Sequence, residues 1–175
     1  MNRRGVLQLG LAGGVLLALG GVGLHLRPVV RNHRPRGPLH VLDAGEFAVL
    51  AAAAARIVLV PGADPVTIAH GVDEALTFGP PESAADFKKL LGLIESALAG
   101  LLLDGRWESF TRLDAAGQDA VLYHFRDSRL VLRRSGYQAL RKLCLGAYYA
   151  GESSWSFVGY PGPPDIRLPP DYKVE

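Results

Sequence analysis

Few side chains in this chain combine the type and the surroundings that catalysis requires. A hydrolytic or acyl-transfer site would join a nucleophile to a general base and to a group that orients the base. Three of the five histidines lie before residue 41, which leaves His70 and His124, each isolated on a predicted helix. A lone helical histidine is typical of a helix surface or core. An enzymatic alternative would have to use His124, Tyr123 or Cys144, which no motif spacing connects.

The cysteine content argues against a metal or haem site in this chain. The CxxC patterns of zinc and haem sites, like a disulfide, need at least two cysteines, whereas Cys144 is the only one. Because Leu143 and Leu145 flank it within a helical pattern, we expect a buried apolar residue rather than a reactive or intermolecular thiol. The segment Gly159-Tyr160-Pro161-Gly162 lacks the preceding strand and following helix of a dinucleotide-binding loop. We therefore expect no cofactor in this chain.

The charged residues are expected to form solvated surface. Asp73 and Glu74 are adjacent and point in different directions on a helix, so they do not form a catalytic pair. A basic helix face comprises Arg126, Arg129, Arg133, Arg134, Arg141 and Lys142. We expect it to be solvated, and the alternative is contact with an acidic partner or lipid headgroups. The net charge is only +2, part of it N-terminal, and no nucleic-acid motif is present, which excludes nucleic acid as a partner.

The N-terminus has the features of an export signal. Arg3 and Arg4 precede an apolar run over residues 6–26 that contains no charged residue. This pattern predicts a twin-arginine signal, an address for the transport of folded proteins across a bacterial membrane. The alternative is a plain transmembrane anchor, since about 20 apolar residues span a bilayer. A Pro- and Arg-rich linker is predicted over 27–41, and no clear cleavage site precedes it, so an uncleaved anchor stays open. The periplasm, or the periplasmic face of the inner membrane, is the expected location.

Two helices are predicted first in the domain at 42–150. Asp43 and Glu46 have the spacing of a capping box, and apolar residues follow at three- and four-residue steps through an alanine-rich stretch. Pro61 ends that pattern. Asp64 followed by Pro65 then predicts an N-cap and first residue of a second helix.

Three further helices complete the expected all-α domain, a compact bundle of about five helices. A third should begin at Ser83 to Asp86, which resembles a capping box, with apolar residues from Phe87 to Leu102 on its buried side. A fourth is expected at about Ala115 to Arg126, and a fifth from near Ser128 to Tyr149. Gly136 lies inside the fifth, where glycine costs about 1 kcal/mol relative to alanine, so we expect a kink or break there. No segment alternates as a strand would.

The C-terminal segment, 151–175, is rich in glycine, proline and aromatic residues, and we expect no helix in it. Its aromatic side chains are unfavourable in water, which favours an ordered, extended tail over a disordered one. Such a segment could contribute to a partner interface or fold back onto the helices, and the sequence leaves both open. The candidate interface residues are Tyr148, Tyr149, Trp155, Phe157, Tyr160, Pro161, Gly162 and Pro163.

Several of these features occur together, and in this order, in one protein family. They are Arg3-Arg4, the first helix with Leu50, Ala54 and Ile57 leading into Pro61, the segment Asp64 to Val72, Phe110-Thr111-Arg112-Leu113 with Gln118, and the run from Tyr148-Tyr149 through Trp155 to Gly159-Tyr160-Pro161-Gly162-Pro163. On these residues the chain resembles the gluconate 2-dehydrogenase subunit 3 family. The aromatic GYPGP tail after a helical domain is the most specific element. The linker departs from the family pattern in its arginine and proline content.

The resemblance implies a non-catalytic small subunit of a periplasmic flavin-dependent sugar or polyol dehydrogenase of the GMC type. In such complexes FAD is bound by a large catalytic subunit, which the small subunit escorts through twin-arginine export and stabilises. A cytochrome c subunit often completes the complex. The alternatives are an exported helical enzyme and a membrane-anchored scaffold without a dehydrogenase partner. The substrate is not readable here, because the residues that select it would belong to the catalytic chain.

Overall fold

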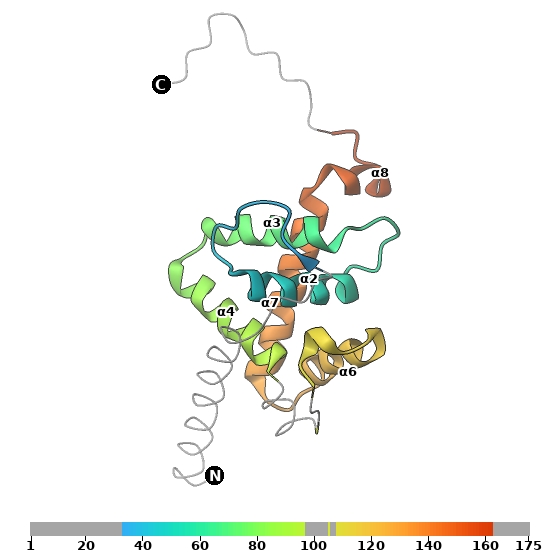
Figure 1. Ribbon diagram of the computed structural model, residues 1–175. Helices are drawn as coiled ribbons and strands as arrows, with labels where there is room; N and C mark the ends of the chain where they lie inside the picture. Colours follow the sequence, from blue (N-terminus) through green and yellow to red (C-terminus); the bar gives the residue numbers. More distant parts are fainter. Residues whose placement is uncertain (1–32, 97–104, 106–107, 163–175) are drawn as a thin grey trace, which may run out of the picture.

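The computed structural model describes residues 33–96, 105 and 108–162, and this part of the chain is helical, without strands (Figure 1). Its five longer helices are α2 (Ala44–Ile57), α3 (Pro65–Thr77), α4 (Pro81–Glu95), α6 (Ala115–Arg126) and α7 (Val131–Ala150). The short elements are η2 (Phe110–Arg112), η3 (Glu152–Ser154) and α8 (Trp155–Val158). The predicted all-α class with about five helices is confirmed for the described residues. The predicted signal at 1–26 lies outside them, as do residues 163–175.

Helix α2 forms the centre of the bundle and contacts α3, α4, α6 and α7 (Figure 1). It begins with the predicted capping box: Asp43 accepts hydrogen bonds from the N–H groups of Gly45 and Glu46, and Glu46 accepts one from Asp43 N–H. Residues 47–54 are all buried, and a helix that is apolar on every side belongs in an interior. The small alanine side chains at 51–54 let the neighbouring helices approach it closely.

Helix α3 starts as the sequence predicts. Asp64 caps it by accepting hydrogen bonds from the N–H groups of Val66 and Thr67, and Pro65 occupies the first turn. The Thr67 hydroxyl also donates to Asp64, at 2.6 Å, and this bond is the main cause that lowers the pKa of the Asp64 carboxyl. Arg36, from the segment before α2, pairs with the same carboxylate at 2.6 Å. The cap therefore also fixes the N-terminal segment to α3.

Helix α4 begins two residues earlier than predicted. Its first residue is Pro81, and Pro80 is its N-cap without any side-chain hydrogen bond, so the predicted capping box at Ser83 and Asp86 is wrong. The reason is local geometry: a residue that precedes proline is driven to extended backbone, and proline is favoured in the first turn. Helix α4 ends at Glu95, and the predicted continuation at residues 97–102 lies outside the described residues.

Two polar contacts join η2 and α6 to the helices around them. The buried Glu95 carboxylate accepts hydrogen bonds from Thr111, one from its N–H at 2.9 Å and one from its hydroxyl at 2.8 Å. Arg56 of α2 forms a bidentate pair with Asp119 of α6, at 2.8 and 2.6 Å. Helix α6 itself begins at the predicted residue, after Asp114 caps Gly117 N–H.

Helix α7 runs without interruption through Gly136, so the predicted break there is wrong. Its start is at Val131, later than predicted. Glycine at position 136 leaves room for a side chain of α4: a Cβ there would lie 2.6 Å from Cδ1 of Leu90, so Leu90 would have to move. Gly71 of α3 plays the same part against α7, since its Cβ would lie 3.2 Å from Cβ of Ala147. Small residues thus permit two close helix crossings.

The chain after α7 is not extended throughout. A 3-10 turn, η3, and the single helical turn α8 occupy 152–158, so the expectation of no helix after Gly151 is wrong for these residues. Ser154 is buried, and its hydroxyl donates to the carbonyl groups of Tyr149 and Gly151, which holds the turn against the end of α7.

Candidate partner interface

The residues considered for catalysis are not brought together. Cys144 is fully buried in the core, and burial raises the pKa of its thiol to about 12, which confirms the predicted apolar role. Tyr123 and His124 lie exposed on α6, where the guanidinium of Arg126 covers the Tyr123 ring at 4.5 Å. His70 packs against the Phe47 ring at 4.8 Å between ring centres. No group of three or more metal-ligating side chains occurs in the described part of the chain.

The surroundings of Asp73 differ from those predicted. It was expected on solvated surface, but its side chain is fully buried, whereas Glu74 is exposed. Its carboxylate accepts three backbone hydrogen bonds, from the N–H groups of His40, Val41 and Leu42, at 2.6 to 3.0 Å. We call residues 36–42 the N-terminal strap, because these bonds hold them along α3. The strap is also bound at its start, where His70 Nε2 accepts a hydrogen bond from the N–H of Arg36.

The basic face is only partly solvated. Arg133 is buried and its guanidinium lies 4.3 Å from the centre of the Phe125 ring, so its prediction as a solvated residue is wrong. Aromatic rings attract a cation placed over their face, and this stabilises such a burial. Arg129, Arg134, Arg141 and Lys142 are exposed as expected, and Arg126 pairs with Asp127 at 2.7 Å. Helix α7 therefore presents positive charge to solvent.

The predicted interface residues of the C-terminal segment differ in their surroundings. Tyr148 is buried in the core, while Tyr149 and Tyr160 are 46% and 44% exposed. Trp155 contacts the Tyr160 ring at 5.3 Å between ring centres, and the Tyr160 N–H donates to Trp155 O. Gly162 approaches the Trp155 ring, and Pro161 is exposed. The Phe157 side chain and Pro163 lie outside the described residues. The segment thus forms a small aromatic cluster of its own beyond α7.

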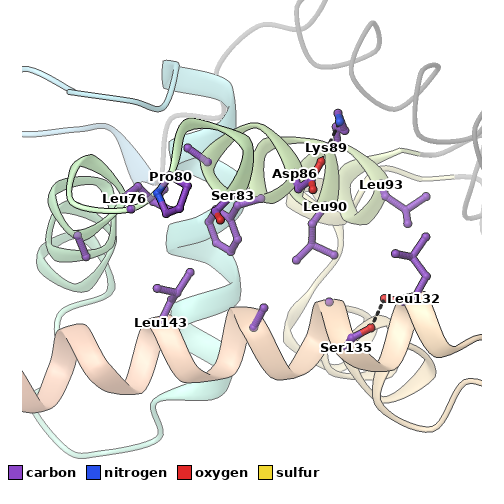
Figure 2. A pocket seen from close by; sticks show the side chains of 16 residues that line it. Leu76, Pro80, Ser83, Asp86, Lys89, Leu90, Leu93, Leu132, Ser135 and Leu143 are labelled. Atoms are coloured by element: carbon purple, nitrogen blue, oxygen red, sulfur yellow. Dashed lines mark hydrogen bonds and ion pairs between the residues drawn. The ribbon is translucent and has the colours of Figure 1, made fainter.

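A groove lies between the end of α3, α4 and α7. Its volume is about 630 Å³. Figure 2 shows Leu90 and Leu93 of α4 directed toward α7, and Leu132 and Leu143 of α7 directed toward α4. The wall also contains small residues from all three helices, namely Ala75, Ser83, Ala84, Ser135, Gly136 and Ala139.

The chemistry of the groove is apolar. Its ionisable lining residues are Asp86 and Lys89, which pair with each other at 2.8 Å on the exposed side of α4. Apolar surface continues at both ends: Phe78, beside Gly79, is 84% exposed, and Val131 and Leu132 are 69% and 55% exposed. Contiguous apolar surface of this kind marks sites of interaction in soluble domains.

The sequence predicts the helices that line the groove but not the groove itself, because the spacing between helices cannot be read from the pattern of one of them. A local signal did exist, since Leu130-Val131-Leu132 places three large apolar residues at the start of a helix, more than one buried face can accommodate.

None of the helices in the described residues is both long enough and apolar enough to cross a membrane.

Comparison with known proteins supports one family. No curated protein and no solved structure matches the chain. A family model does match, over residues 44–162, and its description is gluconate 2-dehydrogenase subunit 3. The match includes every described helix from α2 to α8, the groove and the aromatic cluster, and its name describes one component of a multi-subunit dehydrogenase. Because the match covers well over half of the sequence, the chain belongs to the gluconate 2-dehydrogenase subunit 3 family.

Proposed function

We propose that this chain is a non-catalytic small subunit of a flavin-dependent dehydrogenase of the GMC type, and that it stabilises the catalytic subunit by binding it. The observation that carries the proposal is the family match over residues 44–162, which names a dehydrogenase subunit. The open apolar groove supports it, because a surface of this kind is suited to contact with another chain. In this proposal FAD is bound by the large subunit, and a cytochrome c subunit is a further component.

The proposal extends to export. Arg3, Arg4 and the apolar run at 6–26 support a twin-arginine signal, and that route transports folded proteins. A catalytic subunit bound to this chain in the cytoplasm would then cross the membrane with it. The complex would function in the periplasm or at the periplasmic face of the inner membrane, tethered there if the signal is retained.

The first test is affinity purification of this chain from the membrane and periplasmic fractions of its native host, with mass spectrometry and a flavin absorbance spectrum of the eluate. We expect a large flavoprotein in a fixed ratio to this chain. A colourless eluate that contains this chain alone would contradict the proposed function and favour a scaffold without a dehydrogenase partner.

Export is tested with the double variant Arg3→Lys and Arg4→Lys. Both this chain and the flavoprotein should remain in the cytoplasm. The matched control is Arg31→Lys with Arg34→Lys, the same chemical change in the linker, which should leave both proteins exported. Periplasmic flavoprotein in the first variant would contradict the escort role while leaving the binding role intact.

A further inference from the structure

The shape of the groove defines what it can receive. Along α7 it extends from Leu132 to Leu143, which is about 16 Å, or three helical turns. Between these two leucines the α7 wall consists of the small residues Ser135, Gly136 and Ala139. Large side chains at the ends and small ones between them leave room for a row of apolar side chains from another element. An amphipathic helix that lies in a groove presents such a row.

The charge around the groove restricts the occupant further. Helix α7 carries no acidic residue, and of its four basic ones Arg133 is buried while Arg134 and Arg141 lie on the side away from the groove, which leaves Lys142. Lys142 is exposed, and it lies three residues after Ala139 and seven after Ser135, which places it at the edge of the groove face by helical periodicity. The opposite wall contributes no net charge from its lining pair, Asp86 and Lys89. An occupant with acidic residues beside its apolar face therefore complements the α7 rim.

The same charges disfavour two occupants that the chain itself could supply. The apolar run at 6–26 is preceded by Arg3 and Arg4 and followed by four more arginines within residues 27–36, so its ends would repel the basic rim. A second copy that docked groove to groove would bring the Lys142 edges of two α7 helices together, and neither helix has an acidic residue to pair with them. Like charges facing each other across an interface suppress such pairings.

We propose that the groove between α4 and α7 receives an amphipathic helix of the catalytic flavoprotein subunit, with acidic residues beside its apolar face. The inference rests on the proposed function and names the surface that binds the catalytic subunit. Val131 and Phe78 extend the apolar area past both ends of the groove. A small apolar ligand would leave those side chains in water, whereas a protein partner covers them.

Co-purification of the flavoprotein tests the shape of the site. Ala139→Trp fills the groove from an exposed position and adds no charge. We expect flavin retained per chain to fall about tenfold or more, the size of effect seen at interface hot spots. Ala120→Trp is the matched control, because Ala120 is exposed on α6, away from the groove, and it should retain flavin like the wild type. Far-UV circular dichroism of each variant confirms that the fold is kept.

Charge reversal tests the rim. Lys142→Glu should reduce flavin retention severalfold at low salt, and the difference from the wild type should shrink as salt screens the contact. Arg141→Glu makes the same change in net charge one residue earlier, about 100° around the helix and away from the groove. It should have the smaller effect. Equal losses in the two variants would mean that overall charge, and not the rim, assists binding.

Cysteine labelling measures whether the groove is open in the isolated chain and covered in the complex. Ala139→Cys supplies a reactive thiol in the groove, while the native Cys144 is buried and its pKa is raised to about 12. Maleimide should label position 139 quickly in the isolated chain and slowly in the complex. Protection already present in the isolated full chain would show that the chain's own segment or a second copy fills the groove, and would overturn the inference.

Failure of the inference and of the proposed function give different results. If the wild type retains a flavoprotein and Ala139→Trp retains as much, the groove is not the docking site, although the subunit role stands. If the wild type retains none, the proposed function fails, and the inference fails with it.

Discussion

Two sides of this bundle differ in whether another segment of the chain covers them. On the α3 side, the N-terminal strap lies along the helix and is fixed by a buried carboxylate, Asp73, that accepts three backbone hydrogen bonds. On the α4–α7 side, no described segment covers the groove, and Leu132 is exposed on its α7 wall beside small residues. A polar group buried by distant parts of the chain has a structural role, because it must be satisfied within the fold. An apolar surface left uncovered is available to a partner.

The largest expected effect lies on the covered side. Asp73→Ala removes the acceptor of three N–H groups, of which that of the buried Leu42 has the least access to water. Because unsatisfied buried donors cost about 1 to 3 kcal/mol each, we expect the free energy of unfolding to fall by about 3 kcal/mol. Urea denaturation followed by circular dichroism measures the change.

Glu74→Ala is the matched control for that variant. Glu74 is the next residue of the same helix and is exposed, so we expect a change within about 0.5 kcal/mol. Equal losses at the two positions would show that α3 tolerates neither change for reasons of helix stability, and the strap would not be the source of the difference.

The features that the sequence predicted are those set within a few residues of one another. Asp43 and Asp64 each cap a helix at the expected position, since a cap involves only the next three residues. The error at the start of α4 was also local. Two prolines determine the geometry there, and their backbone preference overrides the Ser83–Asp86 pattern.

The features that the sequence could not predict depend on parts of the chain that are distant in sequence. Asp73 is bound by residues 31 to 33 positions earlier, and Gly136 is explained by Leu90 on another helix. Arg133 is buried because a neighbouring helix supplies the Phe125 ring. The groove also depends on parts of the chain that are distant in sequence. The spacing of three helices leaves Leu132 exposed, and the pattern of a single helix does not predict this.

A pair of glycine substitutions compares the packing on the two sides, and the expected change in the free energy of unfolding is intermediate in size. Gly71→Ala would place Cβ 3.2 Å from Cβ of Ala147, where two helix backbones meet, and a short side chain cannot rotate away. Because overpacking costs about 1 to 3 kcal/mol and alanine returns up to about 1 kcal/mol of helix propensity, we expect a net loss of about 1 kcal/mol. Urea denaturation again provides the measurement.

Gly136→Ala is the counterpart on the open side. Its Cβ would meet the Leu90 side chain, with Cδ1 at 2.6 Å and Cδ2 and Cγ at 3.5 and 3.6 Å, and this flexible side chain borders the groove. Leu90 can turn into the open space, so the gain in helix propensity should offset the contact, and we expect a change within about 0.5 kcal/mol. A larger loss at Gly136 than at Gly71 would mean that α4 and α7 are packed as tightly as α3 and α7, which would contradict the contrast between the two sides.

The smallest expected effect concerns acid stability and the ion pair between α2 and α6. Arg56 pairs with Asp119 across α2 and α6, and this hydrogen bond is the main cause that holds the pKa of the Asp119 carboxyl below its ordinary value of 3.8. Because the pKa is lower in the folded state, the pair contributes stability above about pH 4 and loses it as pH falls through the folded pKa. Asp119→Asn should reduce the free energy of unfolding at pH 7 by about 1 kcal/mol or less, since both side chains are partly exposed.

The test is the difference between wild type and Asp119→Asn in urea denaturation, measured from pH 7 to pH 3. The difference should narrow as the wild-type carboxylate is protonated. Asp127→Asn is the matched control: Asp127 also pairs with an arginine that lowers its pKa, but that partner is its exposed neighbour Arg126. Adjacent residues meet in the unfolded chain as well, so this pair should contribute no measurable stability at any pH. A difference for Asp119→Asn that stays constant across the range would assign its effect to packing, because only loss of the ion pair depends on protonation.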